Sequence, residues 1–438
     1  MLVDFSFSNF RSFEGEQAFS MTRDARFSDG SFDALSTIAA VYGPNASGKS
    51  NFLKALWAMV TMVCISYSQG DAKTGVPRDP FRLNKKGASE PSSFFIEFLA
   101  GDGQRYRYWF RFDDDRILYE ELDVFKRLGD RLSSHSAKLF SRDPSGISFG
   151  GTFRGPRAQV RKTIELRPNA LVLSAAAAAG IECTQPAFDF FAGGIAYCDA
   201  QGYLSEQARI LNEFKRKTEF SRHLATLIRY ADFGIDAVRS TPAIVDKETR
   251  TRLKKQLQQQ IGADPEKIDQ IFSQEESSTL QFEHVGDGNS AMFDEHSESK
   301  GTIAAMSFFS LALRQLSHPT ITLIDEIDTS LHPSLVEEFV RLFTDPLTNP
   351  HASQLIFTTH DTSLINASGP ADRLIDADQI WLVEKSRTGA SELYPVTDLK
   401  VRKEENIGRN YLNGIYGAVP KPDFHTAFAK IIGEDNRA

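Results

Sequence analysis

One stretch of this 438-residue chain constrains its fold more than any other, because residues 43–50 match the pattern G-x-x-x-x-G-K-[ST]. An apolar run at 37–42 precedes the stretch, and a helix-like run at 51–60 follows it. Glycines let backbone N–H groups turn toward phosphate oxygens, and the N-terminus of the following helix adds a partial positive charge. The order of strand, glycine loop and helix predicts a site for the phosphates of a nucleoside triphosphate.

Individual residues of this stretch have expected contacts. Lys49 is expected to reach the β- and γ-phosphates, and the Ser50 hydroxyl is expected to take one Mg²⁺ position. A nucleoside triphosphate and Mg²⁺ are therefore the expected cofactors, and the resemblance described below implies that the triphosphate is ATP. The predicted cofactor-binding residues of the loop and the first helical turn are Gly43, Asn45, Gly48, Lys49, Ser50 and Asn51.

The composition is that of a soluble globular protein, with 41% hydrophobic and 25% charged residues. The net charge of −8 gives no global attraction to nucleic acid, so a nucleic-acid surface would have to be a local patch. The alternating N-terminus lacks a leader layout, and no apolar run approaches the roughly 20 residues of a membrane span. The three cysteines lack the spacing of zinc ligands, so we expect them to be reduced thiols. We expect a cytoplasmic protein.

Strand-like alternation dominates the first 130 residues outside the loop and its helix. Two short strands around a turn, at 2–10 and 16–21, can pair into the nucleotide domain, and three antiparallel strands are predicted at 93–98, 104–112 and 117–126. Arginines alternate with aromatic residues along 105–112. This alternation fits a half-exposed strand with extended arginine stems or a nucleic-acid-binding face.

The middle of the chain is polar and more helical. Helices are predicted over 205–232 and 246–274, and their apolar residues do not sustain heptads, so no long coiled-coil arm is expected. A basic run lies upstream of these helices. It fits a solvated loop, a nucleotide contact or a nucleic-acid contact, and consists of Arg154, Arg157, Arg161 and Lys162.

The last third alternates helices and strands, which predicts a parallel sheet with right-handed crossovers. Helices are expected at 301–316 and 334–343, and strands at 320–324, 354–358 and 379–384. The nucleotide domain is therefore split. The predicted segments are an ATPase part at 1–90, an antiparallel β-subdomain at 91–130, an inserted, mainly helical region at 131–284, a second ATPase part at 285–400 and a C-terminal extension at 401–438.

Three groups of residues are expected to complete the site. Asp325 and Glu326 end an apolar strand, and ligands of open α/β sheets lie at the carboxyl ends of strands. Asp325 is expected to bind Mg²⁺ directly or through water, and Glu326 to orient or activate the water that attacks the γ-phosphate. His360 follows a second apolar strand, which predicts an imidazole beside the γ-phosphate. Ser299 and Gly301 open a helix and predict a second anion site.

In this order of motifs the chain resembles the ATP-binding-cassette ATPases of the soluble branch that includes SMC-like, RecF-like and OLD-like proteins. The resemblance makes 43–50 the Walker A loop, 321–326 the Walker B strand, Asp328 the D-loop aspartate and His360 the switch histidine. Ser299 and Gly301 become the signature, although the sequence there is Ser-Lys-Gly and not Leu-Ser-Gly-Gly-Gln. In that family the signature of one subunit caps the ATP of the other, which implies a head-to-head homodimer or a higher even oligomer. Gln69 is the Q-loop candidate only by its order in the chain.

More narrowly, the chain resembles the compact AAA-family ATPases of the RloA type, found in bacterial phage-defence and abortive-infection operons. The residues that carry this resemblance lie at 7–13, 42–50, 79–81, 325–333 and 408–420. It implies an ATPase that serves as sensor and switch for a separately encoded effector, plausibly a nuclease. OLD-like nucleases carry a Toprim domain after the ATPase, and only about 40 residues follow the last strand region here, fewer than a usual domain.

Two alternatives stay open. The chain fits a RecF-like repair ATPase that binds duplex DNA directly, although its acidic charge and lack of coiled-coil arms count against this reading. It also fits a scaffold that ATP stabilises and that hydrolyses ATP slowly. The fold class predicted under all three readings is α/β, a split P-loop ATPase domain with N-terminal antiparallel strands and an inserted, largely helical region.

Overall fold

The computed structural model describes residues 1–26, 34–69, 71, 73–129, 131–231, 233–242, 278–367, 372–402, 404–420 and 422–435. The chain forms two compact units. The first contains Met1–Cys198, His318–Asp328 and Val340–Ala438, and the second contains Asp199–Ser317 and Thr329–Phe339. Their bounds differ from the predicted segments, because 131–198 belongs to the first unit and 285–317 to the second. The helix predicted at 246–274 lies outside the described residues.

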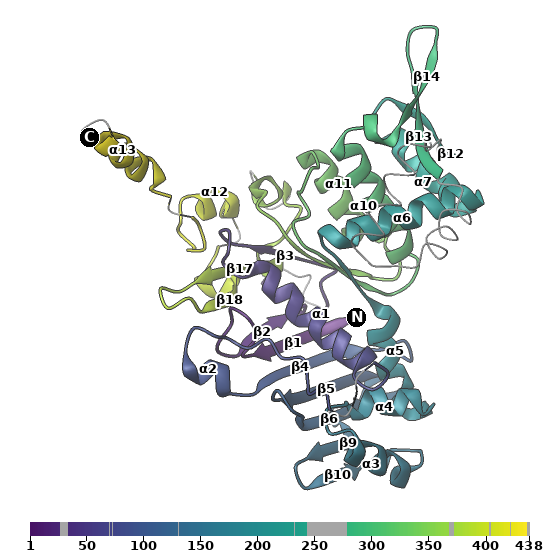
Figure 1. Cartoon of the computed structure of the whole chain (residues 1–438), viewed down its shortest axis with the longest axis vertical. Helices are drawn as coiled ribbons and strands as arrows, with labels where there is room; N and C mark the ends of the chain where they lie inside the picture. Colours follow the sequence, from purple (N-terminus) through teal and green to yellow (C-terminus); the bar gives the residue numbers. More distant parts are fainter. Residues whose placement is uncertain are drawn as a thin grey trace, which may run out of the picture. The chain divides into compact units, whose positions relative to one another are not determined.

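The first unit contains a six-stranded sheet, of which Figure 1 labels β3, β17 and β18. Its first five strands are parallel, and the sixth pairs antiparallel with the fifth. β3, β15 and β16 are buried along their whole length, as expected for parallel strands that are covered on both faces. The predicted α/β class is confirmed. In sheet order the strands are β11 (Ile195–Cys198), β15 (Ile321–Ile324), β16 (Gln354–Thr358), β3 (Ile38–Tyr42), β17 (Ile380–Lys385) and β18 (Ser391–Pro395).

The second sheet of this unit has seven strands and is antiparallel. It joins the two N-terminal strands to the three strands predicted before residue 130, so these five form one sheet. The sheet continues through two further strands that lie beyond the predicted bound of residue 130. In sheet order its strands are β10 (Gly146–Phe149), β9 (Ala137–Asp143), β6 (Ile117–Phe125), β5 (Arg105–Phe112), β4 (Ser92–Leu99), β1 (Leu2–Ser8) and β2 (Gln17–Ser20).

Helix α1 (Lys49–Ile65) follows β3 and packs against the antiparallel sheet. The ring of Phe52 lies 6.4 Å from that of Phe7 and 4.9 Å from that of Phe19, centroid to centroid. Further hydrophobic residues of α1 share the same buried core with residues from both sheets. This packing fixes the helix, and with it the end of the phosphate loop.

Three helices follow the antiparallel sheet in the chain, namely α3 (Arg157–Leu166), α4 (Val172–Ala178) and α5 (Gln185–Gly194), and Phe190 of α5 stacks on Phe98 of β4. The predicted basic run extends into α3, which contains Arg157, Arg161 and Lys162, and it makes local contacts. Arg154 and Arg157 donate to backbone carbonyls of the 150–153 turn, and Arg161 donates to the carbonyl of Ile147. Arg157 and Arg161 therefore hold β10 and its following turn to the helix, while the Arg154 contact lies within the connection between β10 and α3.

The side chains of β5 alternate as the sequence predicted. Tyr106, Tyr108 and the other even positions are buried, while the odd positions are partly or fully exposed. Arg105 and Arg107 both contact the carboxylate of Glu97 on the neighbouring strand. This arrangement fits a half-exposed strand whose arginines have acidic partners on the sheet surface.

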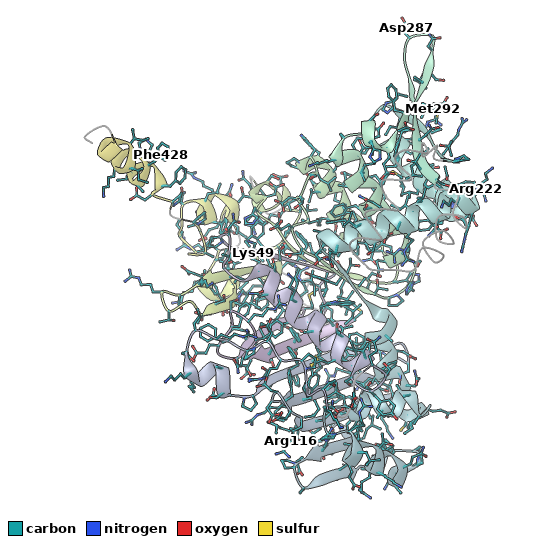
Figure 2. All side chains as sticks on the ribbon, viewed as in Figure 1. Lys49, Arg116, Arg222, Asp287, Met292 and Phe428 are labelled. Atoms are coloured by element: carbon teal, nitrogen blue, oxygen red, sulfur yellow. The ribbon has the colours of Figure 1, made fainter. Side chains whose placement is uncertain are left out.

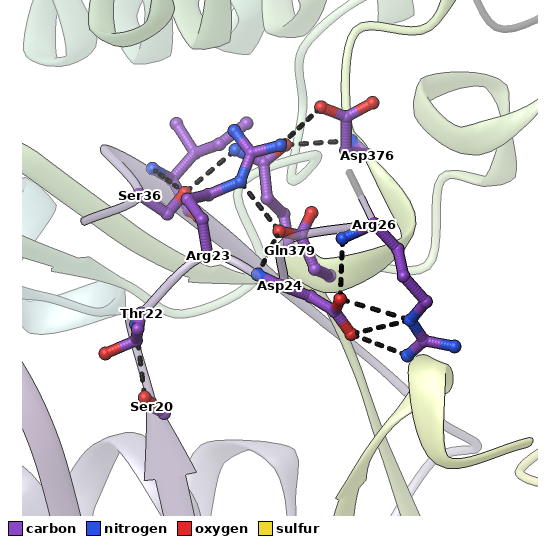
Figure 3. Close-up of polar contacts among 10 residues, drawn as sticks. Ser20, Thr22, Arg23, Asp24, Arg26, Ser36, Asp376 and Gln379 are labelled. Atoms are coloured by element: carbon purple, nitrogen blue, oxygen red, sulfur yellow. Dashed lines mark hydrogen bonds and ion pairs between the residues drawn. The ribbon is translucent and has the colours of Figure 1, made fainter. Parts of the chain in front are cut away.

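A polar cluster links the segment after β2 to the short 3₁₀ helix before β17, η5 (Ala377–Gln379) (Figure 3). Arg23 donates to Asp378 at 2.7 Å and to Asp376 at 2.6 Å. Next to it, the Gln379 amide donates to the hydroxyl of Ser36. The cluster ties the chain on the N-terminal side of β3 to the C-terminal strand β17.

The second unit combines helices with a three-stranded antiparallel sheet, β12-β13-β14. The predicted helix at 205–232 is wrong as a single helix. It divides at Lys217, whose φ is +52°, and Thr218 then caps the second helix. Phe282 and Met306 lie in the buried core of this unit. Its main elements are α6 (Ala200–Arg216), α7 (Glu219–Tyr230), β12 (Ile235–Pro242), β13 (Ser278–Val285), β14 (Ser290–Asp294) and α10 (Lys300–Gln315).

Shorter elements complete the described chain. They are α2 (Lys85–Ser89), β7 (Arg127–Leu128), β8 (Arg131–Leu132), η1 (Glu182–Thr184), η2 (Glu295–Ser297), α11 (Pro333–Thr344), η3 (Thr362–Ile365), η6 (Val396–Leu399), α12 (Ile407–Leu412) and α13 (Phe424–Asp435). Among the described residues, no helix combines the length and the apolar character needed to cross a bilayer.

Candidate functional site

The phosphate loop connects the buried strand β3 to α1 and depends on two glycines. Gly43 has a φ of +155° and Gly48 a φ of +121°. A Cβ atom at Gly43 would lie 2.3 Å from the carbonyl oxygen of Val383, and one at Gly48 would lie 2.7 Å from Oγ of Ser391. Both positions therefore exclude a side chain, by backbone conformation as well as by space.

Lys49 is the first residue of α1, and Figure 2 marks its place at the start of that helix. Its Nζ donates to the carbonyl oxygens of Gly43 at 2.9 Å and Pro44 at 3.3 Å, and lies 3.1 Å from Nε2 of His360. The side chain is buried, and this burial lowers the pKa of the ammonium group. The cation thus lies inside the curve of the loop.

Asp325 follows β15 directly and meets two hydroxyl groups. Ser50 donates to its Oδ1 at 3.0 Å, and Thr358, the last residue of the neighbouring strand β16, donates to the same oxygen at 2.8 Å. The carboxyl ends of β15 and β16 therefore fix the carboxylate beside the first turn of α1. The structure brings together Ser50 and Asp325, the two predicted metal ligands.

Glu326 has an unusual backbone. Its φ is +55°, in the left-handed region that residues other than glycine seldom adopt. Its N–H donates to the hydroxyl of Thr358 at 2.7 Å, and the N–H of Ile327 donates to the carbonyl of Thr358 at 3.0 Å. The end of β16 therefore holds a strained turn at the residue predicted to activate water, and such strain is common at functional sites.

His360 lies in the loop after β16. Its backbone N–H donates to Oδ2 of Asp328 at 3.3 Å, and the Oδ1 atom of Asp328 is buried without a hydrogen-bond partner among the described residues. Burial, followed by the positive charge of Lys49, lowers the pKa of the His360 imidazole. A neutral imidazole next to a cation can accept a hydrogen bond through Nε2.

Sequence reasoning missed several residues that support the loop. Asn51 donates to the Ser12 hydroxyl at 2.9 Å, and the N–H of Ser391 donates to the Ser12 carbonyl at 2.7 Å. The Ser391 hydroxyl donates to the carbonyl of Ser47. The N-terminal turn and β18 therefore both hold the loop. Of Ser12 and Ser391, only Ser12 belongs to a stretch that the sequence singled out, the 7–13 motif.

The residues present fit a Mg²⁺-bound nucleoside triphosphate. The hydroxyl of Ser47 is buried in the loop without a hydrogen-bond partner among the described residues, and the Lys49 ammonium lies next to the loop carbonyls. Ser50 and Asp325 form a pair of hard oxygen ligands, and Mg²⁺ commonly takes one or two such protein ligands along with phosphates and waters. In the described part of the chain, no group of three or more His, Cys, Asp or Glu could hold a metal ion.

Four other predicted residues take no part in the contacts described above. Ser299 and Gly301 belong to the second unit, where Ser299 caps α10 by accepting from the N–H of Thr302 at 3.0 Å. Asn45 is exposed on the loop. The Q-loop candidate Gln69 is exposed in the turn beyond the C-terminal end of α1, whereas the phosphate loop precedes the N-terminal end.

Comparisons with known proteins give one family and several structures. A family model described as "AAA domain, putative AbiEii toxin, Type IV TA system" matches residues 38–366. No curated protein sequence matches the chain. The fold is similar to that in "Crystal structure of the SmcHead bound to the C-winged helix domain of ScpA", with a TM-score of 0.40, 13% identity and coverage of 91% of this chain and 99% of that one. It is also similar to "Structure of the recombination mediator protein RecF-ATP in RecFOR pathway", with a TM-score of 0.35, 11% identity and coverage of 90% and 99%.

Proposed function

The chain belongs to this AAA-domain family, whose model spans about three-quarters of its length, and on that premise we propose that it is a Mg²⁺-dependent ATPase that dimerises around ATP. One observation carries the proposal. The buried Lys49, the Ser50–Asp325 oxygen pair and the strained Glu326 converge at the end of the phosphate loop, within a single unit of the structure.

Binding of the triphosphate rests on the loop and on α1. When bound, Mg-ATP supplies the phosphoanhydride bond that is cleaved, and the metal neutralises charge on the phosphates. Backbone N–H groups of 45–50 and the Lys49 ammonium bind the β- and γ-phosphates, and burial keeps solvent from screening the lysine charge. Ser50 and Asp325 would hold the metal, and the Thr358 hydroxyl orients the Asp325 carboxylate by donating a hydrogen bond to it.

Hydrolysis needs a base and a group that senses the γ-phosphate. The Glu326 carboxylate accepts a proton from a water molecule as the water oxygen forms its bond to the γ-phosphorus. The bond between that phosphorus and the β–γ bridging oxygen breaks, and the products are ADP and phosphate. His360, which lies beside Lys49, contacts the γ-phosphate. The strained backbone of Glu326 sets the direction of its carboxylate.

Dimerisation follows from the signature residues. In the proposed closed state, the start of α10 with Ser299 and Gly301 meets the ATP held by a second copy of the chain, and Asp328 lies at the junction. A helix N-terminus attracts anions, and a Cβ at Gly301 would lie only 3.0 Å from the carbonyl oxygen of Ser330. Homodimers or higher even oligomers are the resulting assemblies.

The Glu326→Gln variant tests the catalytic assignment. It keeps the size of the side chain but removes the base, so ATP should still bind and hold the dimer closed. We expect turnover to fall about a hundredfold or more, and light scattering with Mg-ATP should show accumulated dimer. Glu165→Gln, an equal charge change at an exposed position of α3, is the control. Unchanged turnover in Glu326→Gln would sink the assignment.

For the biological role, we propose a switch subunit of a cytoplasmic anti-phage system, in which ATP-driven closure and opening hold or release a separately encoded effector, plausibly a nuclease. The AbiEii-type family and the RloA-like motifs support this role. The test is a plaque assay with the native operon. Lys49→Ala should abolish protection, while Lys54→Ala on the same helix should not. Full protection by Lys49→Ala would favour a scaffold that does not depend on nucleotide.

A second candidate is direct DNA binding, favoured by one local feature. Although the chain is acidic, four cationic side chains are exposed around the α6–α7 junction, which Figure 2 marks with Arg222. They are Lys215, Arg216, Lys217 and Arg222. A salt series of duplex binding, with and without ATP, tests this function, because binding through these cations should weaken steeply with salt. Lack of binding at low salt would remove it.

A further inference from the structure

The three-stranded sheet of the second unit ends in an open edge. Among the described residues its strand order is β12-β13-β14, so β14 pairs with one neighbour there, and all five of its residues are exposed. Figure 1 draws β13 and β14 as a long hairpin, and Figure 2 marks Asp287 at its tip and Met292 on β14. A strand with one free edge presents unpaired N–H and C=O groups that can pair with another chain.

The alternation of hydrogen-bonded and non-bonded pairs between β13 and β14 shows which backbone N–H and C=O groups of β14 face the open edge. Gly286 donates to the carbonyl of Asn289 at 2.8 Å, and the register pairs Met292 with Glu283 and Ala291 with His284. Hydrogen-bonded and non-hydrogen-bonded pairs alternate in an antiparallel ladder. The Gly286–Asn289 bond therefore makes Ala291–His284 a bonded pair and Met292–Glu283 a non-bonded pair. The backbone groups of Met292, and of its alternate neighbours on β14, point to the open edge.

The hairpin also exposes apolar side chains. Val285 is 60% exposed, Phe293 43% and Met292 39%. Proteins usually protect such edges with lysine, proline, bulges or a covering element. The segment 279–299 contains no lysine and no proline. The edge therefore combines open main-chain groups with unprotected apolar surface, which is the combination that strand addition uses.

The charge of the hairpin selects the occupant. Residues 281–299 include five carboxylates and neither lysine nor arginine. Among the described residues, Glu283 has Arg239 as its ion-pair partner and Glu298 has His284, while Asp287, Asp294 and Glu295 make no ion pair. This charge repels a second copy of the same hairpin as well as nucleic-acid phosphates.

We propose that the open edge of β14 binds an extended segment of a separate protein, with alternating basic and apolar residues, as a fourth strand of this sheet. Main-chain hydrogen bonds at the edge supply the pairing, while the exposed apolar side chains and the carboxylates select the sequence. The proposal deepens the partner half of the proposed function and rests on it only in identifying this separate protein with the effector.

A direct contact connects the hairpin to the signature. Nε2 of His284 lies 2.8 Å from Oε1 of Glu298, and the ring of Phe293 packs edge-on against His284 at 5.1 Å. Glu298 precedes Ser299, the N-cap of α10. A strand that docks beside Phe293 therefore acts two contacts away from the residue expected to meet ATP, which gives partner binding a short physical route to nucleotide binding.

The binding test uses a defined probe and the full chain without nucleotide. The probe is a fluorescent peptide of about eight residues that alternates valine and lysine, long enough to cover β14. The Met292→Pro variant removes an outward N–H and spares the ladder to β13, since edge strands tolerate proline there. We expect it to weaken binding about tenfold or more relative to the matched Met292→Leu variant, which keeps that N–H. Equal melting temperatures of the two variants establish that the fold is intact.

Two further arms decide the chemistry of the occupant. A peptide that alternates valine and glutamate should bind far more weakly than the lysine peptide, and added salt should weaken the lysine peptide. Equal binding of both peptides, or equal affinity of Met292→Pro and Met292→Leu, would overturn the proposal. A nucleotide-free dimer that Met292→Pro dissolves would also overturn it in favour of a second copy. The Lys49→Ala chain should bind the peptide normally. Peptide binding therefore tests the β14 edge independently of whether the ATPase proposal is correct.

Discussion

Nζ of Lys49 lies 3.1 Å from Nε2 of His360, although the two residues are 311 positions apart in the chain. The parallel pairing of β3 with β16 creates this contact, because it places the phosphate loop and the His360 loop at the same end of the sheet. An ammonium group and an imidazole at this distance cannot both carry a positive charge without repulsion. Their proximity thus has a consequence for pH.

The first prediction concerns acid sensitivity. The pKa of His360 is lowered by burial and then by Lys49, so below about pH 6.5 the unfolded state binds a proton that the folded state resists. Stability of the nucleotide-free protein should fall as the pH drops below this value, and this contribution should level off below the folded pKa. Thermal unfolding from pH 8 to 5 checks it, and His360→Gln should show a shallower fall. Identical slopes for both proteins would contradict the assignment.

The second prediction concerns Thr358, whose hydroxyl donates to Asp325 and accepts from the Glu326 N–H. Thr358→Val keeps the shape of the side chain but removes the hydroxyl, so the Asp325 carboxylate and the Glu326 N–H both lose this hydrogen bond. Removal of such an outer contact typically costs 10–100-fold in metal affinity or activity, and we expect roughly tenfold lower turnover and a higher Mg²⁺ requirement. ATPase assays over a Mg²⁺ series measure both. Thr358→Ser, which keeps the hydroxyl, should retain most activity, and equal loss in the two variants would point to packing instead.

The third prediction concerns Gly48. Alanine there needs a φ near +121° and a Cβ within 2.7 Å of the Ser391 oxygen, so the loop must move. We expect the displaced loop to bind ATP about tenfold or more weakly, which corresponds to a loss of about 1.4 kcal/mol or more in binding free energy. Titration with a fluorescent ATP analogue measures the change. Gly101→Ala, at a turn where a Cβ meets nothing within 4 Å, is the control and should bind ATP normally.

The fourth prediction concerns the cluster of Figure 3. Arg23→Met leaves the Asp378 carboxylate, 3% exposed, without its cation and should destabilise the fold by roughly 2–4 kcal/mol. Arg26→Met, which removes a more exposed pair with Asp24, should cost less than about 1 kcal/mol. Denaturant unfolding gives both values. Adding Asp378→Asn to Arg23→Met should recover part of the loss, and strict additivity of the two changes would show that they are not coupled.

Local sequence was sufficient for the parts of the site that lie within one strand–loop–helix unit. The pattern at 43–50 and the apolar runs beside it predicted β3, the loop and α1, and α1 starts at Lys49 as the motif requires. Asp325 and His360 were predictable because each follows a short apolar strand, and the ends of such strands meet at one edge of a parallel sheet. Each of these positions can be predicted from the residues next to it in the sequence.

Long-range contacts left no such pattern. Ser391 and Ser12 both hold the loop, but the register of β18 and the N-terminal turn, which lie at opposite ends of the sequence, decides that they do so. β11 (Ile195–Cys198) has four residues and follows α5 directly, so its run was too short to separate from the helical region around it. Its role as a strand depends on pairing with β15, more than 100 residues later.

The position of β3 between β16 and β17 also matters while the chain is being synthesised. β3 is complete at Tyr42, whereas its two neighbours begin only at Gln354 and Ile380. At about 5–20 residues per second, roughly 15–60 s pass before either neighbour emerges from the ribosome. During that time a strand that is entirely buried in the finished protein has two open edges. The soluble yield of this protein should therefore depend on translation speed and on chaperones that cover short apolar segments.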